Sequence, residues 1–177
     1  MKINKNYGIC FCIFGLSGSG KSTIGKLIKK EIEKRYGKTL LVHGDEIRNI
    51  YNLKGYKKNY RIKLGKSNAD LCKLITKQKI NVIFTTVSLI HEIQNYYKLN
   101  IKNFMEIYIK SDIKTLLKKK KKIFYKRKTN FVMGLDLKPQ FPKKPNIIIN
   151  NDFKKSPKQL STIALNLISK QIKSNNE

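Results

Sequence analysis

Residues 15–22 carry a pattern that can do chemistry, G-x-x-x-x-G-K-[ST], which is typical of a phosphate-binding loop. The stretch consists of Gly15, Leu16, Ser17, Gly18, Ser19, Gly20, Lys21 and Ser22, and Thr23 follows it. The glycines allow the backbone to turn tightly and to aim its N–H groups at phosphate oxygens. Lys21 is expected to reach the β- and γ-phosphates, and the Ser22 hydroxyl to bind Mg²⁺. Residues 15–23 are therefore the expected site of a magnesium-bound nucleoside triphosphate.

A second candidate group follows the apolar run Thr39–Val42, which predicts a short buried strand. Asp45 comes just after it, at the edge of the sheet where ligands bind in open α/β folds. A carboxylate at this place can hold Mg²⁺ through water or accept a proton from a hydroxyl nucleophile. Arg48 lies three residues later and shares that side if a helical turn follows. The alternative is a surface ion pair between these two residues.

Apolar runs and helical spacing alternate along the chain, which predicts an α/β fold with one parallel sheet covered by helices on both faces. At 177 residues the chain is expected to form a single domain, 1–177, with a disordered tail at 174–177. Tyr60–Lys79 shows helical spacing at Leu64, Leu71, Leu74 and Ile75. The other expected strands are Ile9–Phe14, Asn81–Val87, Phe104–Ile109 and Asn146–Ile149. Two further helices are expected over Thr23–Tyr36, which Gly37 ends, and over Leu89–Leu99. Another begins over Asp112–Leu117, and the last is capped by Ser156 and runs to about Lys173.

The chain is strongly basic, with a formal charge of +28 from 39 Lys and Arg against 11 Asp and Glu. Such an excess suggests a nucleic-acid partner. The lysines are nevertheless spread along the whole chain, so a general lysine-rich bias of the composition is the better interpretation. No dedicated nucleic-acid function is expected. The exception is the lysine run 118–122, whose mutual charge repulsion disfavours close packing against the rest of the domain.

The three cysteines do not form a disulfide framework. Cys10 and Cys12 point to one side of the first strand and, like Cys72, are interpreted as small buried apolar residues. The run 9–14 is too short for a membrane span, and no signal peptide is apparent. These features predict a cytoplasmic protein without a membrane partner.

Several short motifs, in order along nearly the whole chain, resemble the adenylylsulfate kinase family. They are Gly15–Thr23, Gly44-Asp45-Glu46-Ile47-Arg48, Gly55-Tyr56 with Arg61, Val87-Ser88, Phe124-Tyr125-Lys126-Arg127 and Gly134-Leu135-Asp136. The resemblance implies a P-loop kinase of the α/β class with a basic lid at about 118–138, and a homodimer. Such enzymes move the γ-phosphoryl group of MgATP onto the ribose 3′-hydroxyl of a nucleotide.

The resemblance also implies roles for individual residues. Lys21 and Asp45 would be catalytic, with Asp45 positioning or deprotonating the acceptor hydroxyl and sharing Mg²⁺ with Ser22. Arg48 and Arg61 would hold the 5′ anionic group of the acceptor. The remaining acceptor contacts would be Tyr56, which stacks on the base, Phe131, which closes on it from the lid, Ser88 and Lys126.

The chain departs from the family in its acceptor half. The family has an asparagine three residues after the counterpart of Arg61, whereas this chain has Leu64 there and Asn68 one turn later. The lid before Phe131 is shorter, and the motif around Phe131 carries an extra residue. A relative of this kind, from bacterial capsule phosphoramidate synthesis, phosphorylates the same 3′-hydroxyl on a cytidine 5′-diphosphate-like nucleotide. The altered acceptor half favours cytidine 5′-diphosphoramidate as the acceptor.

Other interpretations stay open at this level. Adenylylsulfate is the first alternative acceptor. A sugar or nucleoside kinase on the same fold would share Lys21 and Asp45 but not the motifs from Gly55 to Asp136. A nucleic-acid-binding protein that uses the loop as a switch and a scaffold with an inactive loop are further classes, and intact Lys21, Ser22 and Asp45 disfavour the scaffold.

Overall fold

The structure is a computed structural model, and it describes residues 3–118 and 131–173. Its strands are β1 (Cys10–Gly15), β2 (Thr39–His43), β3 (Asn81–Thr86), β4 (Phe104–Lys110) and β5 (Ile147–Asn150). They form one sheet in the order β2-β3-β1-β4-β5, and every neighbouring pair is parallel. The expected α/β class with a parallel sheet is therefore confirmed. The expected tail at 174–177 and most of the expected lid lie outside the described residues.

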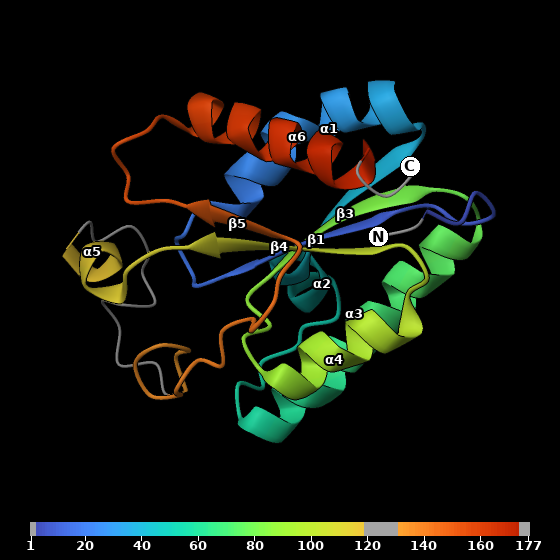
Figure 1. The fold of residues 1–177 in the computed structure, drawn as a ribbon. Coiled ribbons are helices and arrows are strands. Elements are labelled where there is room, and N and C mark those ends of the chain that lie inside the picture. Colours follow the sequence, from blue (N-terminus) through green and yellow to red (C-terminus); the bar gives the residue numbers. More distant parts are fainter. Residues whose placement is uncertain (1–2, 119–130, 174–177) are drawn as a thin grey trace.

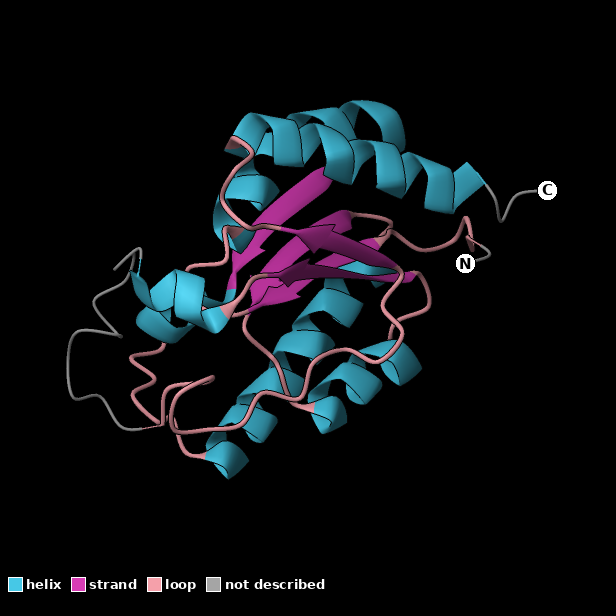
Figure 2. Cartoon of the chain, turned by 60° about the vertical axis from the view of Figure 1, so that its left-hand side comes forward, coloured by secondary structure: helices cyan, strands magenta, loops and turns pink. Residues whose placement is uncertain are grey.

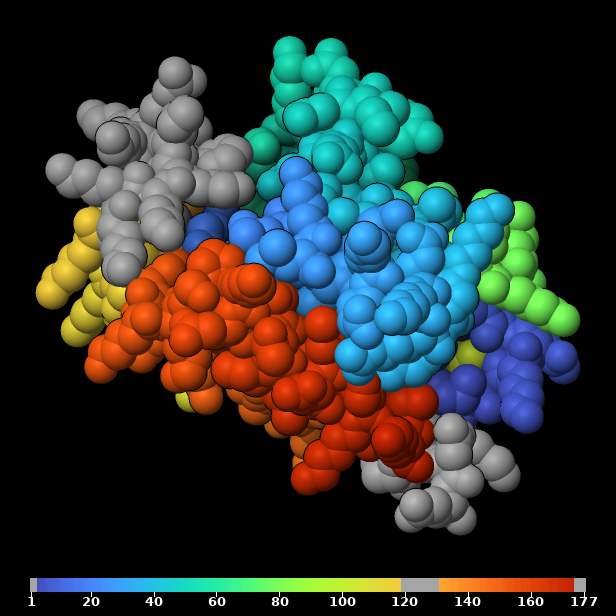
Figure 3. All heavy atoms as spheres, turned by 90° about the horizontal axis from the view of Figure 1, so that it is seen from above, coloured from blue at the N-terminus to red at the C-terminus, as the bar shows by residue number. Residues whose placement is uncertain are grey.

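Helices cover both faces of this sheet (Figures 1 and 2). Helices α1 (Lys21–Tyr36) and α6 (Pro157–Lys173) pack against each other on one face. Figure 3 shows them side by side in blue and red. The other face carries α3 (Lys58–Lys77) and α4 (His91–Asn100). Two short helices, α2 (Gly44–Ile50) and α5 (Ile113–Lys118), follow β2 and β4. None of the described helices is both long and apolar enough to span a bilayer.

The central strand β1 explains why both faces must be covered. All six of its residues are buried, as expected for the middle strand of a parallel sheet. Because side chains alternate along a strand, Cys10, Cys12 and Phe14 join the core under α3 and α4, whereas Phe11 and Ile13 join the core under α1 and α6. Cys72 of α3 lies in the same core as Cys10 and Cys12, and all three thiols are free and buried, as expected.

Both ends of the layer formed by α1 and α6 are fixed by polar contacts. At the start of α6, the Ser156 hydroxyl accepts a hydrogen bond from the N–H of Gln159 at 3.2 Å, and the Gln159 side chain accepts one from the N–H of Ser156 at 2.8 Å. This reciprocal pair is a capping box, which confirms the expected cap at Ser156.

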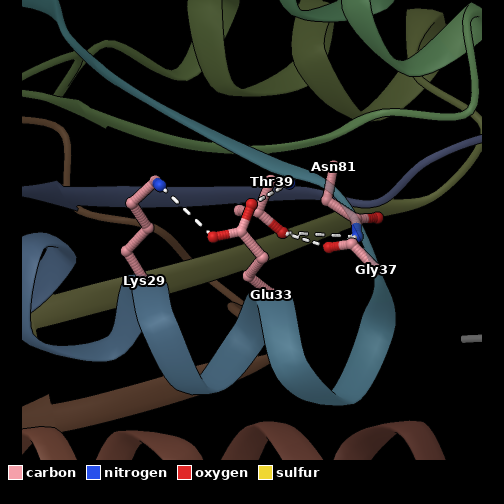
Figure 4. A network of polar contacts seen from close by, with 5 residues as sticks. All are labelled: Lys29, Glu33, Gly37, Thr39 and Asn81. Carbon is pink, nitrogen blue, oxygen red and sulfur yellow. Dashed lines mark hydrogen bonds and ion pairs between the residues drawn. The ribbon is translucent and has the colours of Figure 1, made fainter.

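At the end of α1, the side chain of Asn81 ties the helix to the sheet (Figure 4). Its amide donates to the carbonyl oxygen of Gly37 at 3.1 Å, while Glu33 accepts from the N–H of Thr39 at 3.3 Å. Gly37 itself has φ +93° and donates to the carbonyl of Glu33, as expected for a glycine that ends a helix. These contacts set where β2 and β3 begin, and hence where their opposite, carboxyl ends lie.

One leucine of the expected helical pattern lies outside the buried face of α3. Leu74 is 57% exposed, whereas Ile75 packs against the core. The buried positions of the helix are Gly65, Asn68, Ala69, Cys72 and Thr76. Small residues occupy this face because α3 lies close to α4: a Cβ added to Gly65 would be 2.7 Å from the side chain of Ile93. Tight packing against a neighbouring helix thus overrides the leucine periodicity.

Candidate active site

The glycine-rich loop lies between β1 and α1, as the motif predicts. Gly18 and Gly20 have φ of +82° and +96°, a conformation that residues with a Cβ rarely adopt. The buried Lys21 is the first residue of α1, and its ammonium group donates a hydrogen bond to the carbonyl oxygen of Leu16 at 2.8 Å. Asn151, just after β5, donates from its side chain to the carbonyl oxygen of Ser19 at 2.9 Å. The loop is therefore held from both sides at the amino end of a long helix, a place that favours anions.

A cavity of about 580 Å³ opens beside this loop, and we call it the donor cavity. Its walls come from the loop and the start of α1 on one side and from the segment between β5 and α6 on the other. That second wall contributes Lys154 and Lys155 to the lining, together with Phe153. The donor cavity thus combines phosphate-binding backbone groups, cations and an aromatic ring. Sequence reasoning missed the contribution of the segment after β5, although its place at the carboxyl edge of the sheet was a usable signal.

A second cavity, also of about 580 Å³, lies on the side of α3 and α4, and we call it the acceptor cavity. It is lined by α2, the loop 54–57, the first half of α3, the segment 86–90 and residues 131–133. Of the residues that the structure describes, four line both cavities: Ser17, Asp45, Thr86 and Val87. Asp45 therefore lies at the boundary where a group bound in one cavity meets a group bound in the other.

Ser22 and Asp45 both line the donor cavity, and their oxygens suit Mg²⁺, which prefers hard oxygen ligands. Mg²⁺ is usually held by one or two carboxylates together with the phosphates of its substrate, so no dense ligand cluster is required. Within residues 3–118 and 131–173, no group of three or more His, Cys, Asp or Glu side chains is placed to hold a metal ion. The residues present thus fit an ion that arrives with a nucleotide.

Behind Ser22, buried polar side chains connect it to the end of β2. The Ser22 hydroxyl lies 3.5 Å from the hydroxyl of Thr85, and Thr85 shares a 2.7 Å hydrogen bond with Nδ1 of His43. His43 and Thr85 are both buried. The sequence motifs did not single out either residue. Their positions at the carboxyl ends of β2 and β3 were the available signal.

Two arginines lie together on the wall of the acceptor cavity. Arg48 donates to the carbonyl oxygen of Gly55 at 2.9 Å, and Arg61 donates to that of Tyr56 at 2.9 Å. Their guanidinium carbons lie 4.6 and 5.2 Å from the centroid of the Tyr56 ring, in cation–π contact. Burial first, and then the like charge of Arg48, lower the pKa of Arg61. Two cations held close together in a partly desolvated wall form a favourable site for an anionic group.

Residues 131–133 form another side of this cavity. The carbonyl oxygen of Phe131 accepts a 2.8 Å hydrogen bond from Arg61, and the side chain of Phe131 is 37% exposed. Asp136 accepts from the N–H of Val132 at 2.7 Å and so holds the turn that contains Gly134. A Cβ on Gly134 would be 3.0 Å from the side chain of Leu16, so the turn packs against the phosphate-binding loop.

The structure brings most of the expected acceptor residues to this one cavity. Its lining includes Asp45, Arg48, Tyr56, Arg61, Ser88 and Phe131, together with Leu64 and Asn68. Asp45 and Arg48 lie on one side of α2, as expected if a helical turn follows the strand. The Ser88 hydroxyl is 2.9 Å from that of Thr86. Lys126 lies outside the described residues.

Comparison with known proteins gives consistent matches. Residues 7–150 match the family Adenylylsulphate kinase. The chain is 32% identical over 151 residues to the cytidine diphosphoramidate kinase of Campylobacter jejuni, covering 83% of this chain and 88% of that protein. It is also 32% identical over 154 residues to the adenylyl-sulfate kinase of Clostridium acetobutylicum, covering 84% of this chain and 77% of that protein.

Among solved structures, the chain is similar to the APS kinase CysC of Mycobacterium tuberculosis in complex with AMPPNP and APS. The TM-score is 0.82 with 21% sequence identity, over 92% of this chain and 98% of that one. At this identity the likeness supports the fold, and the sequence matches supply the relationship. Family match, fold and phosphate-binding loop agree, and the chain belongs to the adenylylsulfate kinase family, a family of P-loop nucleotide kinases.

Proposed function

We propose that this chain transfers the γ-phosphoryl group of MgATP to the ribose 3′-hydroxyl of a small nucleotide that carries an anionic 5′ group. The observation that carries the proposal is the shared wall of the two cavities. One cavity has the phosphate-binding loop, the other has the arginine pair, and both are lined by Asp45. Transfer between two bound nucleotides requires this kind of meeting point, because catalysis here depends on positioning and charge stabilisation.

In the donor cavity the loop N–H groups and Lys21 would hold the triphosphate and offset charge that develops on the transferred group. Mg²⁺, bound through Ser22, Asp45 and the phosphates, would supply further neutralisation. Asp45 would orient the acceptor hydroxyl and take up its proton. The acceptor oxygen then bonds to the γ-phosphorus, the bond to the β-phosphate oxygen breaks, and ADP leaves.

In the acceptor cavity Arg48 and Arg61 would bind the 5′ anionic group, for which charge-assisted hydrogen bonds are the strong ones. Tyr56 and Phe131 would contact the base, and Ser88 would contact the sugar. The ring of Tyr56 already stacks with both guanidinium groups, so in this proposal it also positions the arginines. Lys126 would reach the acceptor from the lid.

We favour cytidine 5′-diphosphoramidate as the acceptor. The Campylobacter jejuni relative is named a cytidine diphosphoramidate kinase. In addition, Leu64 lines the acceptor cavity at the position where the family resemblance implies an asparagine. A ligand group that loses a hydrogen bond there costs about 1–3 kcal/mol, which corresponds to roughly a tenfold to hundredfold loss of affinity. That difference is large enough to decide between two acceptors of otherwise equal fit.

Adenylylsulfate is the second candidate. The family match and the Clostridium acetobutylicum relative, an adenylyl-sulfate kinase, favour it. Both candidates would use the same donor cavity and the same arginine pair. They would differ in the contacts made to the base and in the kind of 5′ group that the arginines bind.

Initial rates of ADP formation with the two acceptors, at matched MgATP concentration, test this choice. We expect a higher kcat/KM for cytidine 5′-diphosphoramidate, and no acceptor-dependent turnover in Lys21→Ala. A clear preference for adenylylsulfate would assign the chain to sulfate activation instead. Turnover with sugars or nucleosides but with neither nucleotide would contradict the proposal as a whole.

Two further expectations accompany the proposal. A homodimer is expected from the family resemblance, and a relative of known structure, from Thiobacillus denitrificans, is described as hexameric. A cytoplasmic location is expected for an enzyme that uses ATP and small nucleotides.

A further inference from the structure

Asn68 is the feature of the acceptor cavity that the proposed roles leave unused. It lies in α3, four residues after Leu64, and only 5% of its surface is exposed. It nevertheless lines the cavity. Its side chain makes no hydrogen bond to any other residue in 3–118 and 131–173. A carboxamide in the wall of a cavity offers one acceptor and two donors in fixed positions, so Asn68 is available to pair with a polar group of a ligand bound there.

The surroundings of Asn68 are apolar. Leu64 and Gly65 share its face of α3 by helical spacing, and both line the cavity. Gly65 lies against Ile93, and the neighbouring wall residues Leu89 and Ile90 are buried. The carboxamide is therefore a polar group set into a wall that suits the flat face of a ring.

The lining of the cavity contains residue types that match the three parts of a nucleotide. Arg48, Arg61, Lys54 and Lys57 supply cations for the 5′ group. Asp45, next to the donor cavity, faces the reacting hydroxyl in the proposed reaction. The wall that contains Asn68 is left for the base, which has apolar faces and a polar edge.

We propose that Asn68 reads the edge of the acceptor base, its carbonyl accepting from the exocyclic amino group while its amide donates to the adjacent ring nitrogen. This inference rests on the proposed function. An asparagine makes such a two-bond contact with the amino edge of adenine in nucleic-acid recognition. Cytosine presents the same donor beside the same kind of acceptor, so both candidate acceptors offer an edge that Asn68 can bind. Asn68 is thus a specificity-determining residue for the base.

The test pairs removal of the side chain with removal of the group that it contacts. Cytidine 5′-diphosphate is compared with the same nucleotide bearing 2-pyrimidinone, which lacks the amino group. Dissociation constants are measured with the donor cavity filled by Mg²⁺ and a non-hydrolysable ATP analogue. The wild-type protein should bind the amino-bearing nucleotide about tenfold more tightly, the value of one buried hydrogen bond. Adenylylsulfate and its 6-deamino counterpart form a second pair, so that the test does not depend on which acceptor is correct.

In Asn68→Leu and Asn68→Ala the two nucleotides of a pair should bind with about equal dissociation constants, because the partner of the amino group has gone. The comparison is a double-mutant cycle between the side chain and the amino group. Ser67→Ala is the matched control. Ser67 is the adjacent residue of α3, is exposed, and bonds only to the carbonyl of Lys63 among the described residues. This control should keep the wild-type preference. Binding of the ATP analogue shows that each variant has folded.

Three results would overturn the assignment, and they are distinguishable. If the Asn68 variants bound both nucleotides of a pair more weakly by the same factor, Asn68 would act through packing, the sugar or the 5′ group. A preference that survives in both Asn68 variants would place the amino group elsewhere. Failure of the wild-type protein to bind any of the four nucleotides would contradict the proposed function itself, along with this inference.

Discussion

Asp45 is the residue on which the proposed reaction turns, since it lines both cavities at the carboxyl end of β2. Asp45→Asn keeps the size of the side chain and removes its capacity to take up a proton. Turnover should fall by about 10²-fold or more, the usual contribution of general-base catalysis, while the variant still binds MgATP. Titration with a fluorescent ATP analogue alongside steady-state kinetics measures both quantities. If nucleotide binding were lost as well, Asp45 would be primarily a metal or structural residue.

Arg61 tests the acceptor site at the same scale. Arg61→Gln removes one of the two cations that flank Tyr56, and the KM for the acceptor should rise by about tenfold to hundredfold because a charge-assisted hydrogen bond is lost. The KM for MgATP should not change. Arg35→Gln makes the same change of charge on the exposed side of α1, where Arg35 pairs with Glu31 at 2.7 Å, and serves as the control. An equal rise for both substrates in Arg61→Gln would contradict its assignment to the acceptor.

At the scale of elements, most of the fold was predictable because its signals are local. Each predicted strand and helix is present, and its ends differ from the prediction by no more than two residues. The phosphate-binding loop carries its own context, a buried strand before it and a helix after it. The exposure of Leu74 did not follow from the helical spacing, because the buried face of α3 depends on the approach of α4 at Gly65. Periodicity within one helix contains no information on how close its neighbour comes.

Some parts of the candidate site were predictable from the sequence and others were not. Asp45 and Arg48 are three residues apart, so their shared side of α2 followed from spacing alone. The contact between Arg61 and Phe131 joins residues 70 positions apart, and only the family resemblance pointed to it. Whether the Asn68 side chain bonds to another described residue depends on every neighbour around it, which no sequence pattern describes.

The buried strand β4 provides a prediction on stability. The side chain of Glu106 is fully buried, and its Oε2 lies 2.7 Å from the ammonium group of Lys98. Burial raises the pKa of Glu106 above the ordinary value of 4.5, although Lys98 opposes this shift. The folded state thus holds this proton more tightly than the unfolded state does. The contribution of Glu106 to stability is full below pH 4.5 and declines as the pH rises through the raised pKa.

Glu106→Gln should remove that pH dependence. The free energy required to unfold the wild-type protein, relative to that of the variant, should be larger at low pH than at neutral pH. Chemical denaturation of both proteins across this range measures the difference. A relative stability of the wild type that increases with pH would mean that the ion pair with Lys98 outweighs burial.

At the scale of the whole molecule, the sheet order brings the parts of the site together. Because β1 lies between β3 and β4, the loop after β1 opens beside the carboxyl ends of these two strands. The pair α1 and α6 and the pair α3 and α4 lie on opposite faces of the sheet (Figure 1). Residues of α1 and α6 line the donor cavity, and residues of α3 and α4 line the acceptor cavity. Among residues 3–118 and 131–173, those that line both cavities are Ser17, Asp45, Thr86 and Val87. This arrangement predicts direct transfer between two nucleotides bound on opposite sides of the sheet.

The position of the transferred phosphoryl group tests this central claim most directly. The protein is incubated with MgATP and cytidine 5′-diphosphoramidate or adenylylsulfate, and ³¹P NMR locates the new phosphate on the product. We predict a phosphomonoester on the ribose 3′-oxygen, formed in equal amount with ADP, and no product from the corresponding 3′-deoxy nucleotide. Release of inorganic phosphate alone, or a phosphate attached to the 5′ group, would contradict the account.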